Sequence, residues 1–163
     1  MNNEINYEIS PAVSLDLGNS VILSLEYSNN TIFALGDNGA WCVEPSGSLL
    51  SYVDWSNQYL KGYAFSENAF FAVLLSTYRA GSQSNLQVVS ADGASSNSLS
   101  FSEQILSLDT SGNYLSVLTG NRLDIYTSDM TLYATLTGTQ GARKILLRSD
   151  GSAMLISPDS ARL

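Results

Sequence analysis

The sequence predicts an all-β chain built from repeated four-stranded units, and the first observation behind this prediction is an internal repeat. The motif ILSL stands at residues 22–25 and again at 105–108. Extending the match without a gap, at a constant offset of 83 residues, aligns VILSLEYSNNTIFALGDNGAWCV with QILSLDTSGNYLSVLTGNRLDIY. Eight columns are identical, more than coincidence would give in a chain rich in Ser and Leu.

The second observation is the regular spacing of small turns, and the third is the alternation of turns with β-rich runs. The turns SNN, SEN, SGN and SDGS, anchored at Asn29, Asn68, Gly112 and Gly151, follow one another at 39, 44 and 39 residues. Periods of about 40 residues are typical of propeller blades of four strands. Runs such as LDIYTSDMTLYATL favour strands over paired helices. We therefore predict a β-propeller of about four such blades.

One stretch could also be a helix. The run ENAFFAVLLSTY at 67–78 is apolar on all sides of its centre, and a helical repeat of similar length would need such segments. Its alignment with NYLSVLTG in the third unit predicts a buried strand instead.

Each unit is expected to contain strands a, b, c and d. In the third unit these strands are predicted at 105–108, 114–118, 123–126 and 132–136. In the first unit the b–c turn GDNGA contains Asn-Gly, which supplies the positive φ angles of a tight hairpin. Its c–d hairpin, VEPSGSLL, places Pro45 and Gly47 where turn chemistry favours them.

The two ends of the chain predict incomplete blades. Strands Ile5–Ile9 and Val13–Leu17 form a c–d pair, and RKILLRSDGSAMLIS forms an a–b pair. The predicted single domain, 1–163, thus divides into 1–19 (strands c and d), 20–55, 56–101 and 102–138 (full blades) and 139–163 (strands a and b). Three arrangements follow: a ring closed by joining the ends, two copies that exchange the end strands as a homodimer, or a partial propeller from a longer chain.

The units resemble those of the β-propeller superfamily with WD40-like and quinoprotein-like repeats. The hairpin VEPSGSLLSYV is similar to the quinoprotein type, and the chain resembles an uncharacterised family of bacterial propeller-like proteins of unknown function. The Gly-His pair and closing Trp-Asp of WD40 repeats are missing, as is the docking tryptophan of quinoproteins. The resemblance therefore implies the architecture and supports no cofactor or catalytic residue.

Composition limits the classes of partner. The chain has 163 residues, a net charge of −8 and a pI near 4.2, so it lacks the clustered positive charge that nucleic acid binding needs. No run is long enough for a membrane span, and the N-terminus MNNEINYEIS has no signal-peptide pattern. Only 13% of residues are charged, which is typical of many extracytoplasmic or membrane-anchored bacterial proteins but leaves the localisation open.

The chain carries few residues suited to catalysis. It has no histidine, which excludes Ser-His-Asp triads, Cys-His pairs and histidine metal sites. The single cysteine, Cys42, is expected to be a buried structural thiol, and no metal site is predicted. Carboxylate chemistry stays open as a glycoside-hydrolysing alternative; its candidate residues are Glu26, Asp109, Glu103 and Asp54.

Binding is the preferred function. In propellers the b–c and d–a loops share one face, called the loop face below. We predict a partner site on this face from Trp55, Tyr59, Tyr78, Arg79, Arg122 and Arg143. Trp, Tyr and Arg are enriched at interface hot spots, and the insertion STYRAGSQSN lengthens only the second unit. Alternatively, Trp55 and Tyr59 pack between blades and the insertion is a plain flexible loop.

The sequence therefore favours a non-catalytic propeller scaffold without cofactor. Its expected partner is a protein or a cell-envelope component bound at the loop face. The alternative is a carbohydrate-binding or glycoside-hydrolysing propeller, which would need aromatic side chains facing carboxylates in a groove.

Overall fold

The computed structural model describes residues 14–95 and 97–163, and these residues form sixteen strands and no helix. The first sheet has the order β1-β2-β3-β4: β1 (Ile22–Ser28), β2 (Thr31–Gly36), β3 (Gly39–Val43) and β4 (Leu49–Asp54). The third sheet has the order β10-β11-β12-β13: β10 (Ile105–Ser111), β11 (Tyr114–Thr119), β12 (Arg122–Thr127) and β13 (Leu132–Thr137). In both sheets every neighbouring pair is antiparallel.

The second sheet divides its outermost position between two short strands. It consists of β5 (Tyr59–Ser66), β6 (Phe70–Ser76), β7 (Ser84–Ser90), β8 (Gly93–Ala94) and β9 (Leu99–Phe101). Strand β8 pairs with the end of β7, and β9 pairs with its beginning. The fourth sheet has three strands, β14 (Lys144–Leu147), β15 (Ala153–Ser157) and β16 (Ser160–Arg162).

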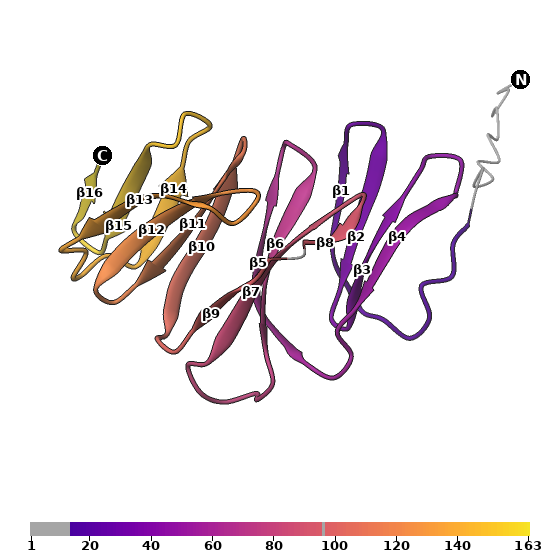
Figure 1. The fold of residues 1–163 in the computed structure, drawn as a ribbon, viewed down its shortest axis with the longest axis horizontal. Coiled ribbons are helices and arrows are strands. Elements are labelled where there is room, and N and C mark those ends of the chain that lie inside the picture. The colour runs from indigo at the N-terminus through magenta and orange to yellow at the C-terminus, as the bar shows by residue number, and fades with distance from the viewer. Residues whose placement is uncertain (1–13, 96) are drawn as a thin grey trace, which may run out of the picture.

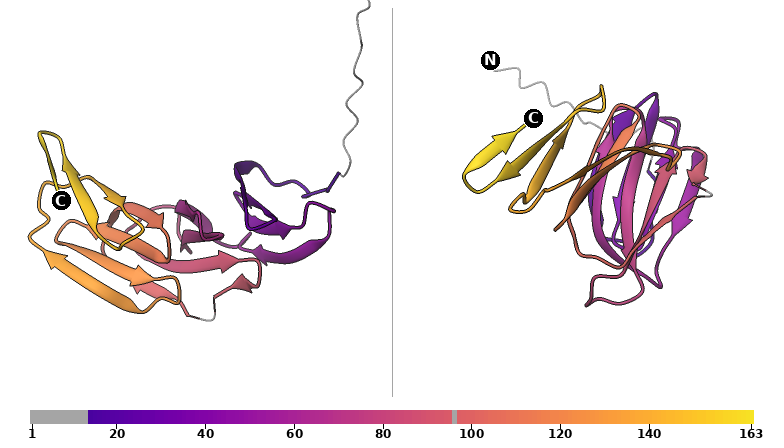
Figure 2. Two further views of the ribbon diagram at one scale, coloured as in Figure 1. Left: turned by 90° about the horizontal axis from the view of Figure 1, so that it is seen from above. Right: turned by 60° about the vertical axis from the view of Figure 1, so that its left-hand side comes forward.

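The sheets stand face to face in a curved row, from β1–β4 at one end to β14–β16 at the other (Figures 1 and 2). The first strands of successive sheets approach one another, since β10 contacts both β5 and β14. This arrangement confirms the predicted all-β, propeller-type architecture. The row is open in the described residues, because its two end sheets lie far apart (Figure 2), as in a partial propeller.

The ends differ from the sequence prediction. Strand β16 adds a c-type strand to the predicted a–b pair. This strand has the sequence Ser-Ala-Arg, which is short, exposed and without an alternating apolar pattern, so the sequence did not predict it. At the other end, Ile5–Ile9 lies outside the described residues, and residues 14–17 of the predicted strand Val13–Leu17 belong to no strand. Leu17 instead packs against the outer face of the first sheet.

Strand β6 explains the apolar run that resembled a helix. Its sequence FFAVLLS is buried along its whole length. Phe71, Val73 and Leu75 pack in a core shared with the first sheet, whereas Phe70 and Leu74 pack in a core shared with the third sheet. Because successive side chains of a strand point to opposite faces, a strand between two neighbours needs apolar residues at every position. The predicted buried strand is therefore confirmed.

The turns between the first two strands of each sheet interlock. Ser28 Oγ donates to the carbonyl of Glu67 at 2.7 Å, and Glu67 Oε1 accepts hydrogen bonds from Gly112 N at 2.7 Å and Ser111 Oγ at 3.2 Å. Gly112 has φ +57°, and a Cβ there would lie 3.2 Å from Ser149 of the next turn. All three interfaces between successive sheets are thus joined by polar or close backbone contacts at the same end of the strands.

The Glu67 carboxylate is the hydrogen-bond acceptor on which this set of turns depends. We expect Glu67→Gln to lower the free energy of unfolding by about 1 kcal/mol at neutral pH, a modest value because the residue is exposed and water screens the charge. Urea denaturation measures the change. Glu44→Gln is the matched control, since its carboxylate bonds only the nearby Ser46.

The effect should also depend on pH. The pKa of Glu67 lies below its ordinary value of 4.5, chiefly because its own backbone N–H donates to the carboxylate and also because Gly112 does. A lowered pKa stabilises the fold above the unfolded-state pKa, and this stabilisation disappears as pH falls through the folded-state value. The difference between wild type and Glu67→Gln should therefore vanish in acid below that range. An unchanged difference would contradict the assigned role.

Candidate functional site

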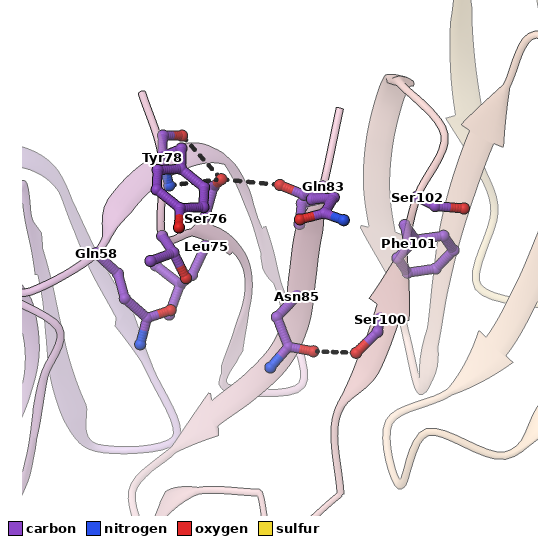
Figure 3. Close-up of a pocket in the computed structure, with 11 residues that line it drawn as sticks. Gln58, Leu75, Ser76, Tyr78, Gln83, Asn85, Ser100, Phe101 and Ser102 are labelled. Carbon is purple, nitrogen blue, oxygen red and sulfur yellow. Dashed lines mark hydrogen bonds between the residues drawn. The ribbon is translucent and has the colours of Figure 1, made fainter. Parts of the chain in front are cut away.

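A groove opens at the loop end of the second sheet, on the face that looks toward the first sheet (Figure 3). Its volume is about 600 Å³. Leu75, Asn85 and Ser100 lie opposite one another on adjacent strands, so one face of the sheet forms the wall. Uncharged polar side chains supply most of the lining, including Gln58, Ser76, Thr77, Gln83, Asn85 and Ser100.

The loop between β6 and β7 is fixed at its base. The Ser76 side chain is buried, and its hydroxyl lies 2.8 Å from the carbonyl oxygens of both Tyr78 and Gln83 (Figure 3). It also accepts a hydrogen bond from the Tyr78 N–H at 3.3 Å. One hydroxyl thus ties the two ends of the loop together and sets the direction in which the loop leaves the sheet.

Aromatic and cationic side chains lie on the loop between β6 and β7 and beside it, and one of them, Tyr78, lines the groove. The Tyr78 side chain is 66% exposed. The Arg79 guanidinium lies 5.8 Å from the centroid of the Tyr59 ring, a cation–π contact. Lys61 Nζ donates a hydrogen bond to the Arg79 carbonyl oxygen. We call Tyr59, Lys61, Tyr78 and Arg79 the rim patch.

The structure brings only three of the six predicted partner-site residues together. Tyr59, Tyr78 and Arg79 come together in the rim patch. Trp55 is only 2% exposed, lies in the core between the first two sheets, and donates from Nε1 to the Asp37 carbonyl at 3.1 Å. It has no free surface for a partner, in agreement with the alternative that it packs between blades.

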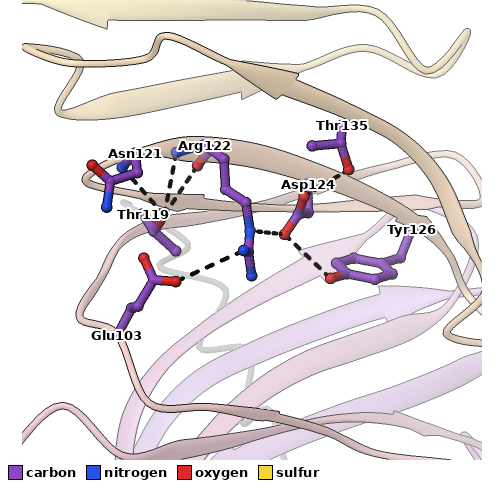
Figure 4. A network of polar contacts seen from close by, with 7 residues as sticks. All are labelled: Glu103, Thr119, Asn121, Arg122, Asp124, Tyr126 and Thr135. Carbon is purple, nitrogen blue, oxygen red and sulfur yellow. Dashed lines mark hydrogen bonds and ion pairs between the residues drawn. The ribbon is translucent and has the colours of Figure 1, made fainter.

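Arg122 belongs to a polar network within the third sheet (Figure 4). Its Nε donates to Asp124 Oδ2 at 2.7 Å, and Glu103 lies 3.8 Å from its NH1 atom. Asp124 is buried and accepts further hydrogen bonds from Thr135 at 2.8 Å and Tyr126 at 3.4 Å. The hydrogen bond to Asp124 raises the pKa of Arg122, and burial raises that of Tyr126. The network satisfies a buried carboxylate and holds β12 to β13.

Arg143 is exposed, and the structure gives its side chain no contact with the rim patch. Only its backbone N–H is fixed, by the Ile156 carbonyl at 2.8 Å. It lies at the start of the fourth sheet, whereas the groove belongs to the second sheet.

The candidate catalytic pair Glu26 and Asp109 lies on two different sheets. Asp109 Oδ2 accepts a hydrogen bond from Leu147 N at 2.8 Å and so joins β10 to β14. Glu26 lies on β1 and accepts from Ser24 at 2.9 Å. Cys42 is buried, and burial raises the pKa of its thiol, which disfavours the reactive thiolate. The described residues contain no cluster of three potential metal ligands.

Lys61 and the amide side chains of the groove were not predicted from the sequence. Lys61 comes two residues after Tyr59 on β5, and this spacing, which places alternate residues of a strand on one face, was the available signal. Gln58, Asn85 and Ser100 gave no signal, because only the pairing of β7 with β9 brings two of them together.

The fold and the groove define a β-propeller-type protein with an uncharged polar site at its loop face. The chain belongs to the family of unknown function DUF5711, which it matches over residues 2–162. No curated protein sequence matches it. Within the described residues, no helix has the length and apolar character needed to cross a membrane.

Several solved structures have a similar fold. BBS1N in complex with ARL6DN matches with a TM-score of 0.58 and 12% identity, covering 92% of this chain and 53% of that one. Hsv2p of Kluyveromyces lactis matches with a TM-score of 0.58 and 15% identity, covering 90% and 48%. The N-terminal domain of Nup159 matches with a TM-score of 0.53 and 7% identity, covering 82% and 38%. The chain thus spans about half the length of the first two.

The Asp124 network predicts a structural role that can be separated from binding. Asp124→Asn should lower the free energy of unfolding by about 2 kcal/mol, because it removes the buried negative charge beside Arg122 and weakens the acceptor for Thr135. Urea denaturation measures the loss. Glu103→Gln is the control and should change stability by less than about 0.5 kcal/mol, since that ion pair is long and exposed. Equal losses in both variants would contradict this assignment.

Proposed function

We propose that this chain is a non-catalytic propeller scaffold that binds a protein partner through the loop face of its second sheet. A protein of the cell envelope is included among the partners proposed. The observation that carries the proposal is the exposed Tyr78, which lines an open groove and is followed in the same loop by Arg79. Tyr and Arg are among the residue types enriched at the hot spots of protein interfaces.

The proposal is supported by the way the loop between β6 and β7 is held on the paired strands below it. The wall of the groove comes from the paired strands β6, β7 and β9, and the buried Ser76 hydroxyl fixes the loop ends. A site on a fixed scaffold loses less conformational entropy on binding than a free loop does. Loops that rise from such a scaffold commonly carry binding function.

The chemistry of the groove also supports a non-catalytic role. Its lining consists of amides, hydroxyls and apolar or aromatic side chains, and includes no carboxylate or thiol. Such groups form hydrogen bonds to a neutral surface. A glycoside hydrolase would instead need two carboxyl groups on either side of the scissile bond.

Carbohydrate binding is the second candidate, and one observation favours it. An exposed Tyr78 ring beside Gln58, Gln83 and Asn85 offers an aromatic surface together with amides that donate and accept hydrogen bonds. The same groups serve a peptide backbone, so the two candidates are separated by experiment.

The test exposes the immobilised protein to a random-peptide phage library and, in parallel, to a glycan array. We expect peptides to be selected, and we expect Tyr78→Ala to weaken their binding by at least about fivefold because it removes an exposed aromatic contact. Fluorescence anisotropy with a selected peptide measures the change. Urea denaturation should show a free energy of unfolding within about 0.5 kcal/mol of wild type.

Tyr133→Ala is the matched control, because Tyr133 is 55% exposed on β13 of the third sheet, away from the groove. It should leave peptide binding unchanged. A glycan signal lost in Tyr78→Ala, with no peptide selected, would replace protein binding by carbohydrate binding. Unfolding of Tyr78→Ala would show that the side chain is structural.

A further inference from the structure

Positive charge is scarce in this chain: of its seven basic residues, two lie in the rim patch and the other five lie at or after residue 122. Residues 14–121 contain nine acidic residues and only two basic ones, Lys61 and Arg79. These two lie 18 residues apart in sequence on different elements, yet Lys61 Nζ donates a hydrogen bond to the Arg79 carbonyl. The fold therefore brings the only two cations of this span to one place, despite the repulsion between like charges.

Neither cation is neutralised in the described residues. The two ion pairs found there both belong to Arg122, with Glu103 and with Asp124. Arg79 lies over the Tyr59 ring, which orients the guanidinium while leaving its N–H groups free for a ligand. Lys61 lines another, smaller cavity of about 210 Å³ together with Gln83 and Gln104.

The two cavities flank the loop that carries Tyr78 and Arg79. Gln83 and Ser84 line both cavities, so the loop base separates the neutral groove from the cavity that contains Lys61. A bound chain that lies across the loop would meet amides and hydroxyls on one side and free cations on the other. This juxtaposition specifies a ligand with both neutral polar and acidic parts.

We infer that the partner segment recognised at this face is an acidic peptide, whose carboxylates pair with Arg79 and Lys61 while its backbone forms hydrogen bonds in the neutral groove. This inference rests on the proposed function and adds the charge of the partner to it. A guanidinium fork matches a carboxylate with two parallel hydrogen bonds, which are shorter and stronger than neutral ones. Charge complementarity at a rim also speeds association and selects among partners.

The experiment compares two fluorescein-labelled peptides of equal length, one with a run of glutamates flanked by serines and one with glutamines in their place. We expect the glutamate peptide to bind at least about tenfold more tightly at low ionic strength. Arg79→Gln and Lys61→Gln should each weaken it about fivefold to tenfold and leave the glutamine peptide unchanged. Added salt should reduce the difference between wild type and these variants.

Arg148→Gln is the matched control, because it removes one exposed positive charge from the fourth-sheet end of the row. It should leave both peptides unaffected, and equal weakening by Arg148→Gln and Arg79→Gln would overturn the inference in favour of unspecific charge attraction. Equally strong binding of a short single-stranded oligonucleotide would overturn it in favour of general anion binding.

The remaining outcomes separate this inference from the proposed function. If both peptides bind equally and Tyr78→Ala weakens both, the acidic preference is wrong and the protein-binding function stands. If neither peptide binds, the inference is overturned, and the phage selection then decides the function independently.

Discussion

The structure depends on apolar packing between the faces of successive sheets. Strand β6 shows the constraint most clearly, since Phe71 and Val73 meet the first sheet while Phe70 and Leu74 meet the third. Burying each such side chain stabilises the fold by about 1.5–3 kcal/mol, but this apolar contribution does not favour one relative orientation of two sheets over another. The relative orientation of successive sheets is set instead by polar contacts at the ends of the strands, such as those of Glu67 with the next turn. Packing holds the sheets together, and the turns set how each is placed against the next.

This division explains why the rim patch can differ between blades. The first and third units share identical residues at buried positions such as Leu35 and Leu118, both 0% exposed. The loop between β6 and β7, at the other end of the strands, adds no residue to the buried clusters. The loop after β6 can therefore change length and composition without disturbing the core, and the buried Ser76 hydroxyl anchors its base. Binding chemistry is added where the repeat imposes the fewest requirements.

The fold was predictable because its signals are local and repeated. Identical columns identify strands that occupy equivalent places, and turn residues such as Gly112 mark the points where the chain reverses. The site was predictable only in part. Tyr78 and Arg79 stand in an insertion visible in the sequence, whereas the contact of Lys61 with Arg79 depends on how separate elements meet in space. Trp55 is buried because of a neighbouring sheet, which no property of its own segment reveals.

The end sheets show that each blade carries two apolar faces irrespective of its place in the row. On β1 the exposed Leu25 and Tyr27 lie opposite Ala34 and Ile32, on the face that looks away from the second sheet. On β14 the exposed Leu146 pairs with Met154 while Ile145 and Leu147 fill the inner core. Because strand side chains alternate, a sequence that repeats its strands also repeats both faces. The same repetition that makes the interior pack so regularly therefore also makes both outer faces suited to pack against a further sheet.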